Sequence, residues 1–112
     1  MSTSTLRKLF QVALGTGDTL IYTTPALTTT TVVALFAVNI DTSERTFRLH
    51  QVDSGGSIAA TNPLFYDQPV SAKRTLRDGG IILEPGQLLR GLCSSASQIV
   101  VTGFGITTLE SS

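Results

Sequence analysis

Hydrophobic and polar residues alternate along most of the chain with the period of two that is typical of β-strands. The alternation is clearest in RTFRLHQV, where Phe47 and Leu49 fall on one face and Arg48 and His50 fall on the other. We therefore expect a strand with one apolar and one solvent-facing side. The glycine-rich residues 53–57, DSGGS, follow this strand and indicate a hairpin turn.

The most hydrophobic part of the chain follows four consecutive threonines and ends at Asn39. Both faces of the strand expected over residues 31–41 are apolar, with Leu35 on one face and Phe36 on the other. Such a strand is typical of the centre of a sheet that is covered on both sides. The β-branched threonines also suit a strand, with their hydroxyls facing water. We expect Phe36, and Phe104 in the last strand, to lie in the core.

The second half of the chain repeats short apolar segments separated by turn residues. We expect residues 62–69, NPLFYDQP, to form a connection, and residues 70–77 to form a more polar strand. The order Pro-Gly in EPGQ, residues 84–87, is typical of a type II turn. Gly103 and Gly105 share one face of the last strand, which indicates a bulge or a close approach of two backbones.

The expected fold is all-β. About seven to nine short strands with regularly spaced turns indicate one antiparallel β-sandwich over residues 1–112, with a jelly-roll or an immunoglobulin-like topology. Residues 1–17 are expected to form an N-terminal arm or a first strand. Residues 6–14 are also compatible with a short helix.

Composition argues against several classes of partner. The 112 residues suit one domain, and only 14% are charged, with eight basic and eight acidic side chains. This balance provides no net field for a nucleic acid or an anionic membrane. No apolar run approaches the ~20 residues of a membrane span, and we interpret the start of the chain as lacking a signal peptide. The single Cys93 allows no internal disulfide and suits a reducing compartment.

No group of side chains predicts catalysis, a metal or a cofactor. His50 is the only histidine, no nucleophile or orienting carboxylate can be assigned to it, and we expect it to be exposed or at an interface. Cys93 lies in an expected strand and is predicted to be a packed thiol. Four carboxylates that could approach a cation lie in expected turns, where acidic residues commonly form local hydrogen bonds. These are Asp41, Glu44, Asp53 and Asp78.

Two segments are candidates for contact with a partner. In VSAKRTLR, the cations either protect an edge strand from aggregation or meet an acidic patch on a partner. In LRKLFQV, apolar side chains beside two cations are expected to dock on the domain or on a neighbouring subunit. The candidate interface residues are Leu6, Leu9, Phe10, Lys73, Arg74 and Arg77.

A longer pattern runs from residue 18 to residue 109. It begins with LIY at residues 20–22 and Pro25, continues through a threonine-rich step and an apolar strand ending in Asn39, and then has a charged strand, a glycine-rich turn and LEPGQ. This order resembles the small β-sandwich virion proteins of tailed bacteriophages, and among them it is most similar to capsid decoration proteins, also called cement or staple proteins. Leu27 stands where members commonly carry glycine.

The resemblance implies a structural protein on the capsid surface, synthesised in the host cytoplasm, that bridges subunits of the major capsid protein lattice and reinforces the shell. With its balanced charge, such a protein is expected to bind through shape and hydrogen bonds and to tolerate moderate salt. Its apolar and hydroxyl-rich strands also predict a homodimer or another homo-oligomer.

The alternative is a phage tail, fibre or receptor-binding β-sandwich, including a carbohydrate-binding module. Exposed aromatic rings would favour sugar binding, but the chain has two tyrosines, five phenylalanines and no tryptophan. A small enzyme of the cupin type would need a histidine cluster for its metal, which one histidine cannot supply.

Overall fold

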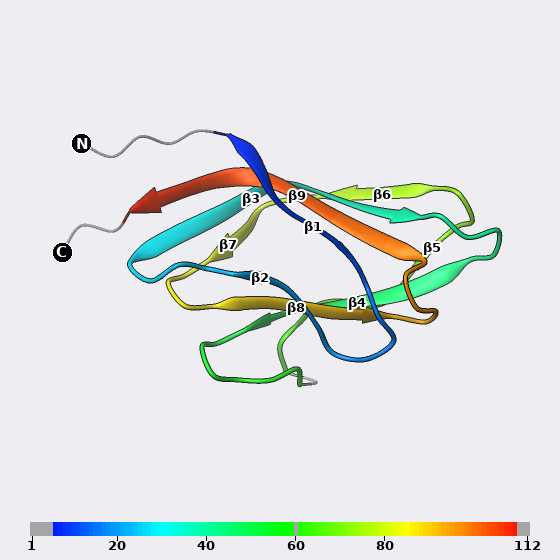
Figure 1. Ribbon diagram of the computed structural model, residues 1–112, viewed down its shortest axis with the longest axis horizontal. Coiled ribbons are helices and arrows are strands. Elements are labelled where there is room, and N and C mark those ends of the chain that lie inside the picture. Colours follow the sequence, from blue (N-terminus) through cyan, green and yellow to red (C-terminus); the bar gives the residue numbers. More distant parts are fainter. Residues whose placement is uncertain (1–5, 60, 110–112) are drawn as a thin grey trace.

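Nine β-strands form two antiparallel sheets that pack face to face in the computed structural model, which describes residues 6–59 and 61–109 (Figure 1). The expected all-β sandwich is confirmed. No membrane-spanning helix is found in the described chain, and the segment considered for a short helix is strand β1. The strands are β1 Arg7–Ala13, β2 Thr19–Thr23, β3 Thr28–Asn39, β4 Arg45–Val52, β5 Pro63–Val70, β6 Thr75–Asp78, β7 Ile81–Leu83, β8 Leu88–Cys93 and β9 Ile99–Leu109.

The strand order is that of a jelly roll. The five-stranded sheet has the order β1-β9-β3-β6 with β7 also paired to β3, and the four-stranded sheet has the order β2-β8-β4-β5. The chain is wrapped as a long hairpin, because β1 pairs with β9, β2 with β8, β3 with β6 and β7, and β4 with β5. Of the two topologies expected from the sequence, these pairings are those of the jelly roll.

The core lies between the two sheets and is built from the inward side chains of both. The four-stranded sheet contributes the buried Phe47 and Leu49 of β4, and the five-stranded sheet contributes the buried Ile99 and Val101 of β9. The ring of Phe47 packs against Phe65 of β5, with 5.3 Å between the ring centroids. This alternation follows the period of two that the sequence shows.

A β-bulge between Val32 and Ala34 changes which side chains of β3 face the core. Val32 is buried before the bulge and Leu35 is buried after it, so Phe36 faces away from the other sheet. Phe104 pairs with Ala34 on the same outer side. The expectation that Phe36 and Phe104 lie in the core is therefore wrong. Their rings contact each other edge to face on the outer surface, with centroids 6.0 Å apart.

The first strand docks on its own domain through Phe10. The Phe10 side chain is buried in the core, and a Cβ atom placed on Gly103 would lie only 2.3 Å from its ring. A Cβ atom on Gly105 would lie 1.9 Å from the backbone oxygen of Thr31. The close backbone approach expected here is confirmed at Gly105, where β9 lies against β3, whereas Gly103 leaves room for the ring of Phe10 from β1.

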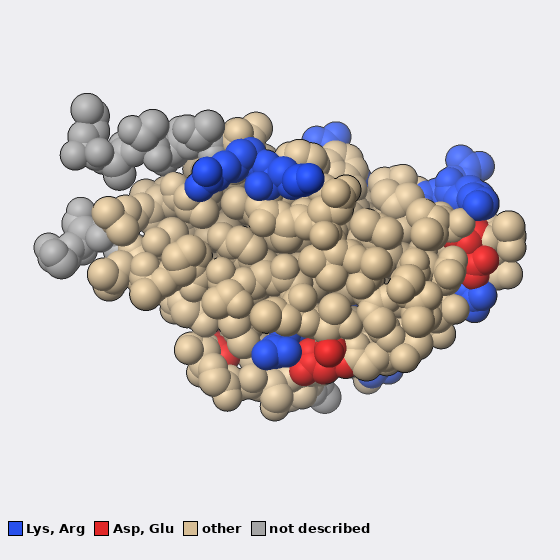
Figure 2. Space-filling model, viewed as in Figure 1, with Lys and Arg blue, Asp and Glu red and all other residues tan. Residues whose placement is uncertain are grey.

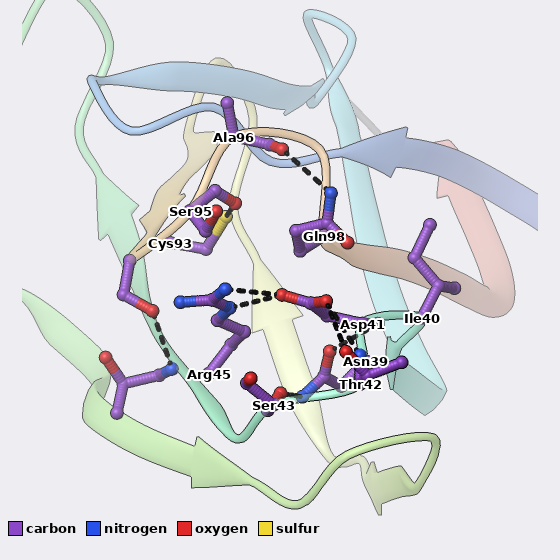
Figure 3. A network of polar contacts seen from close by, with 12 residues as sticks. Asn39, Ile40, Asp41, Thr42, Ser43, Arg45, Cys93, Ser95, Ala96 and Gln98 are labelled. Carbon is purple, nitrogen blue, oxygen red and sulfur yellow. Dashed lines mark hydrogen bonds and ion pairs between the residues drawn. The ribbon is translucent and has the colours of Figure 1, made fainter.

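The hydrophobic strand β3 ends at a buried asparagine that organises the following turn (Figure 3). The amide nitrogen of Asn39 donates to the backbone oxygens of Ser43 and Val70, both at 2.9 Å. Its amide oxygen accepts from the backbone N–H of Asp41, also at 2.9 Å. One side chain therefore joins the end of β3, the β3–β4 turn and the end of β5.

Two expected boundaries in the second half of the chain are wrong. The proline-containing segment is strand β5 and not a connection; β5 is an edge strand, where proline is tolerated because one side of the strand makes no ladder hydrogen bonds. The expected strand over residues 70–77 is interrupted by a turn before β6, with Lys73 at a φ of 60°.

Candidate functional site

The outer face of the five-stranded sheet is apolar over its two central strands. Paired residues of an antiparallel ladder point to the same side, so the register places Phe104 beside Ala34 and Val100 beside Val38 on this face. Apart from Thr102, the outward side chains of both strands are partly or fully exposed. We call this surface, formed by the outward side chains of β3 and β9, the apolar face. Its residues are Thr31, Ala34, Phe36, Val38, Val100, Thr102, Phe104 and Ile106.

The neighbouring strands extend the apolar face on one side and place a cation beside it. Ile82 of β7 pairs with Thr31 and is 58% exposed. Arg77 of β6 pairs with Phe36, and its guanidinium carbon lies 5.6 Å from the centre of that ring. The face thus has an aromatic pair at its centre and a positive charge at its edge.

Charged side chains are distributed unequally between the two sheets. Of the eight lysines and arginines, the three that form ion pairs all lie on β4 and β8 of the four-stranded sheet. The ion pairs are Arg48–Asp67 at 2.7 Å, Arg90–Asp18 at 3.3 Å and Arg45–Asp41, in which Nε of Arg45 donates to the carboxylate at 2.6 Å.

Hydrogen bonds in two of these pairs shift the pKa values of Asp41, Arg48 and Asp67. The Arg48 guanidinium lowers the pKa of Asp67 below its usual value, and Asp67 raises the pKa of Arg48. The hydrogen bond from Arg45 likewise lowers the pKa of Asp41. The three ion pairs each join one cation to one carboxylate, so they leave the four-stranded sheet close to neutral.

Of the other five cations, four lie on or beside the outer side of the sheet, whereas Arg7 pairs with Gly105 and so lies on the side opposite the apolar face. Arg7 and Lys8 lie on β1, Arg77 lies on β6, and Lys73 and Arg74 lie in the turn before β6. None of them forms an ion pair with a carboxylate of residues 6–59 or 61–109. In Figure 2, Lys and Arg atoms stand along the upper edge over β1, where no Asp or Glu atoms are visible.

The five-stranded sheet carries one carboxylate among its described strands, and that group is already engaged. Asp78 pairs with Leu35, whose side chain is buried on the core side of the sheet. The Asp78 carboxylate accepts a hydrogen bond from the backbone N–H of Gly79 at 2.8 Å. It therefore does not neutralise Arg77 on the outer face.

The structure places four of the six sequence-predicted interface residues around this surface. Leu6 is exposed at the start of β1, and the three cations of the second segment lie at the edge of the face. Phe10 is buried and Leu9 packs against the core, so these two do not form a surface. The bulge between Lys8 and Phe10 is the cause, because it breaks the simple alternation.

Sequence reasoning missed the central residues of the face. Phe36 and Phe104 were assigned to the core, because an apolar side chain on a central strand is usually covered. Their position depends on the β-bulge between Val32 and Ala34. The hydrophobic pattern of the sequence contains no signal of this bulge, because both faces of the strand are apolar.

The catalytic candidates occupy structural positions. His50 is 1% exposed, so the expectation of an exposed or interface histidine is wrong. Its Nδ1 lies 2.8 Å from the amide oxygen of Asn62, which also accepts from the Ala59 N–H at 3.0 Å, so Nδ1 is the donor. The β4–β5 connection thus folds over this part of β4. The Cys93 thiol is buried as predicted and contacts the backbone oxygen of Ser95 at 2.9 Å.

Two of the carboxylates considered for ion binding are engaged by other side chains. Asp41 is bound by Arg45, and Asp53 accepts from the side chain of Gln87 at 2.9 Å. Across the described part of the chain, no three His, Cys, Asp or Glu side chains gather in a metal-binding arrangement.

Comparisons with known proteins found little. No protein-family model and no curated protein matches the chain. A chain from a solved structure described as "Structure of infectious bursal disease virus Gx strain" is 9% identical, with a TM-score of 0.48. The match covers 97% of this chain and 32% of that one, so this chain spans about a third of the length of the chain it matches.

Proposed function

We propose that the protein is a structural virion protein that binds the outside of an icosahedral phage capsid and reinforces the shell by bridging neighbouring subunits. The observation that carries the proposal is the uncovered apolar face with unpaired cations at its edge. An apolar centre with a charged rim is the usual anatomy of a protein–protein interface. The order of sequence elements, which resembles capsid decoration proteins, supports the choice of partner.

The size of the apolar face suits weak contacts repeated over a lattice. It spans two strands, each about 4.8 Å wide, and about seven residues of roughly 3.3 Å, which gives on the order of 200 Å². A stable interface buries about 800 Å² on each partner. One such contact is therefore weak, but two contacts made by the same molecule reinforce each other through a high effective concentration.

A second contact is available at the end of the sandwich where β3 begins. Leu27 in the β2–β3 turn is 65% exposed and has a φ of 58°, in the left-handed region that favours glycine. The first residue of β3, Thr28, pairs with the exposed Leu109 of β9. An exposed leucine held in an unfavourable conformation is a frequent sign of a functional surface. The molecule is 48 Å long, which lets its end and its face reach different subunits.

The proposal is tested by adding the purified protein to shells stripped of their decoration protein, counting bound copies and measuring the disruption temperature. We expect saturable binding and a higher disruption temperature, because a ligand of the assembled shell stabilises it. Ile82→Asp should lower the number of bound copies. Leu64→Asp is the matched control, since Leu64 is an exposed apolar residue of the four-stranded sheet at 38% exposure.

Absence of binding by the wild-type protein, or saturation without a rise in disruption temperature, would contradict the proposal. Either result would favour the tail, fibre or receptor-binding alternative. Equal loss of binding in the two aspartate variants would show that the apolar face is not the contact.

A further inference from the structure

We infer that the apolar face docks on an acidic protein surface, with an apolar centre and a rim of Asp and Glu side chains. The inference rests on the proposed function and specifies the chemistry of the partner. It comes from the distribution of charge, which the zero net charge of the chain conceals.

Four of the unpaired cations, Lys8, Lys73, Arg74 and Arg77, form a rim beside a strip that has no charge. The strands β3, β7 and β9 contain no Lys, Arg, Asp or Glu within their described bounds. Lys8 lies on the outer side of β1, opposite Phe104, and Arg77 lies on the outer side of β6, opposite Phe36. The two cations are therefore separated by three strand spacings, about 14 Å.

This arrangement favours a protein over a polyanion. A nucleic acid that reached both rows of cations would have to lay its phosphates across the apolar strip between them. The central rings of Phe36 and Phe104 are half-buried and contact each other edge to face at 82°, so they offer no open platform for stacked bases. A protein patch with an apolar centre and acidic edges can pack against the apolar strip and form ion pairs with the cations of the rim at the same time.

The same charges argue against a second copy of the chain as the occupant. Two copies joined through this face in a symmetric dimer would place cations against cations, and like charges across an interface are unfavourable. The three carboxylates of the four-stranded sheet's ion pairs are already bound to arginines, so its outer side provides few free acidic groups. A homo-oligomer of this protein therefore uses another surface.

The inference changes the expected response to salt. Each exposed ion pair contributes about a twofold change in affinity, so four pairs together contribute on the order of 16-fold. Screening is short-ranged at high ionic strength, with a Debye length of about 8 Å at 0.15 M and about 3 Å at 1 M. Binding should therefore weaken with added salt, in contrast to the salt tolerance expected from the balanced composition.

The test measures the affinity for stripped shells at 50 and 500 mM NaCl with matched charge variants. Lys8→Gln combined with Arg77→Gln lowers the net charge by two on the apolar face. Ser54→Glu combined with Thr61→Glu lowers it by two in the β4–β5 connection, on exposed side chains. Lys8→Arg combined with Arg77→Lys keeps the charge. Circular dichroism confirms that each variant is folded.

We expect wild-type affinity to fall at least tenfold between the two salt concentrations. At 50 mM NaCl the glutamine variant should bind about fourfold more weakly than wild type, while the glutamate control and the charge-preserving variant should bind like wild type. At 500 mM the glutamine variant and wild type should converge.

Wild-type binding that is insensitive to salt and to the glutamine changes would overturn the inference and leave the proposed function intact. An equal loss of affinity in the glutamine and glutamate variants would also overturn it. The affinity would then depend on the net charge of the protein and not on the cations beside the apolar face. No binding of wild-type protein at either salt would overturn both. Tighter binding to a DNA fragment or to phosphatidylserine vesicles than to shells would identify a polyanion as the partner.

Discussion

Alanine substitution of phenylalanines distinguishes the core from the apolar face. Phe47 is buried between the sheets against Phe65, and its truncation leaves a cavity. We expect Phe47→Ala to cost about 3 to 5 kcal/mol. Phe104 is half-buried on the outer face, so water replaces its ring and no closed cavity remains. About half of the ~1.5 to 3 kcal/mol for burying a large side chain is then lost, with about 0.5 to 1.5 kcal/mol for the contact with Phe36.

The resulting cost of Phe104→Ala is about 1.5 to 3 kcal/mol, clearly below that of Phe47→Ala. Urea denaturation followed by circular dichroism measures both. With a slope of about 1.5 kcal/mol per molar, the midpoint should fall by about 2.5 M for Phe47→Ala and by about 1 to 2 M for Phe104→Ala. Equal losses, or a larger loss for Phe104→Ala, would refute the assignment of Phe104 to an outer face.

Three further predictions concern the turns and the ion pairs. Asn39→Ala leaves three backbone groups without their partner and should cost about 2 to 4 kcal/mol in urea denaturation, whereas Gln98→Ala, which removes one long exposed hydrogen bond, should change little. Leu27→Gly relieves the left-handed conformation and should raise stability by about 0.5 to 1 kcal/mol, measured in the same way. Asp41 and Asp67 have lower pKa values in the folded protein than in the unfolded chain. Their ion pairs therefore stabilise the fold fully at a pH above the unfolded-state pKa, and this stabilisation is lost as the pH falls through the folded-state pKa. The thermal midpoint should therefore drop below about pH 4, and less so in a variant with asparagine at both positions.

The sequence predicts the fold class well because the period of two survives in most strands. RTFRLHQV has its apolar face toward the core, and Phe47 and Leu49 are buried as expected. The topology is harder to predict, since the pairing of β1 with β9 joins residues nearly a chain length apart. The jelly roll could not be separated from the alternative until these pairings were known.

The candidate site could be predicted only in part, because bulges and loops act against the local pattern. One extra residue in β3 leaves Phe36 on the outer surface, and one in β1 turns Leu9 toward the core. His50 is covered by a connection that lies beyond its own strand. The sequence gives the number of cations but not which of them form ion pairs. Arg48 has a carboxylate partner on the neighbouring strand, whereas Arg77 lies opposite Phe36, and both facts depend on which strands pair in the fold.

Electron cryo-microscopy of stripped shells saturated with the purified protein would show directly which face of the sandwich contacts the capsid. We expect the five-stranded sheet to face the shell, with Phe36 and Phe104 over an apolar part of a capsid subunit and with Lys8 and Arg77 near its carboxylates. A bound protein that instead turns its four-stranded sheet toward the shell and leaves the apolar face in solvent would contradict the account.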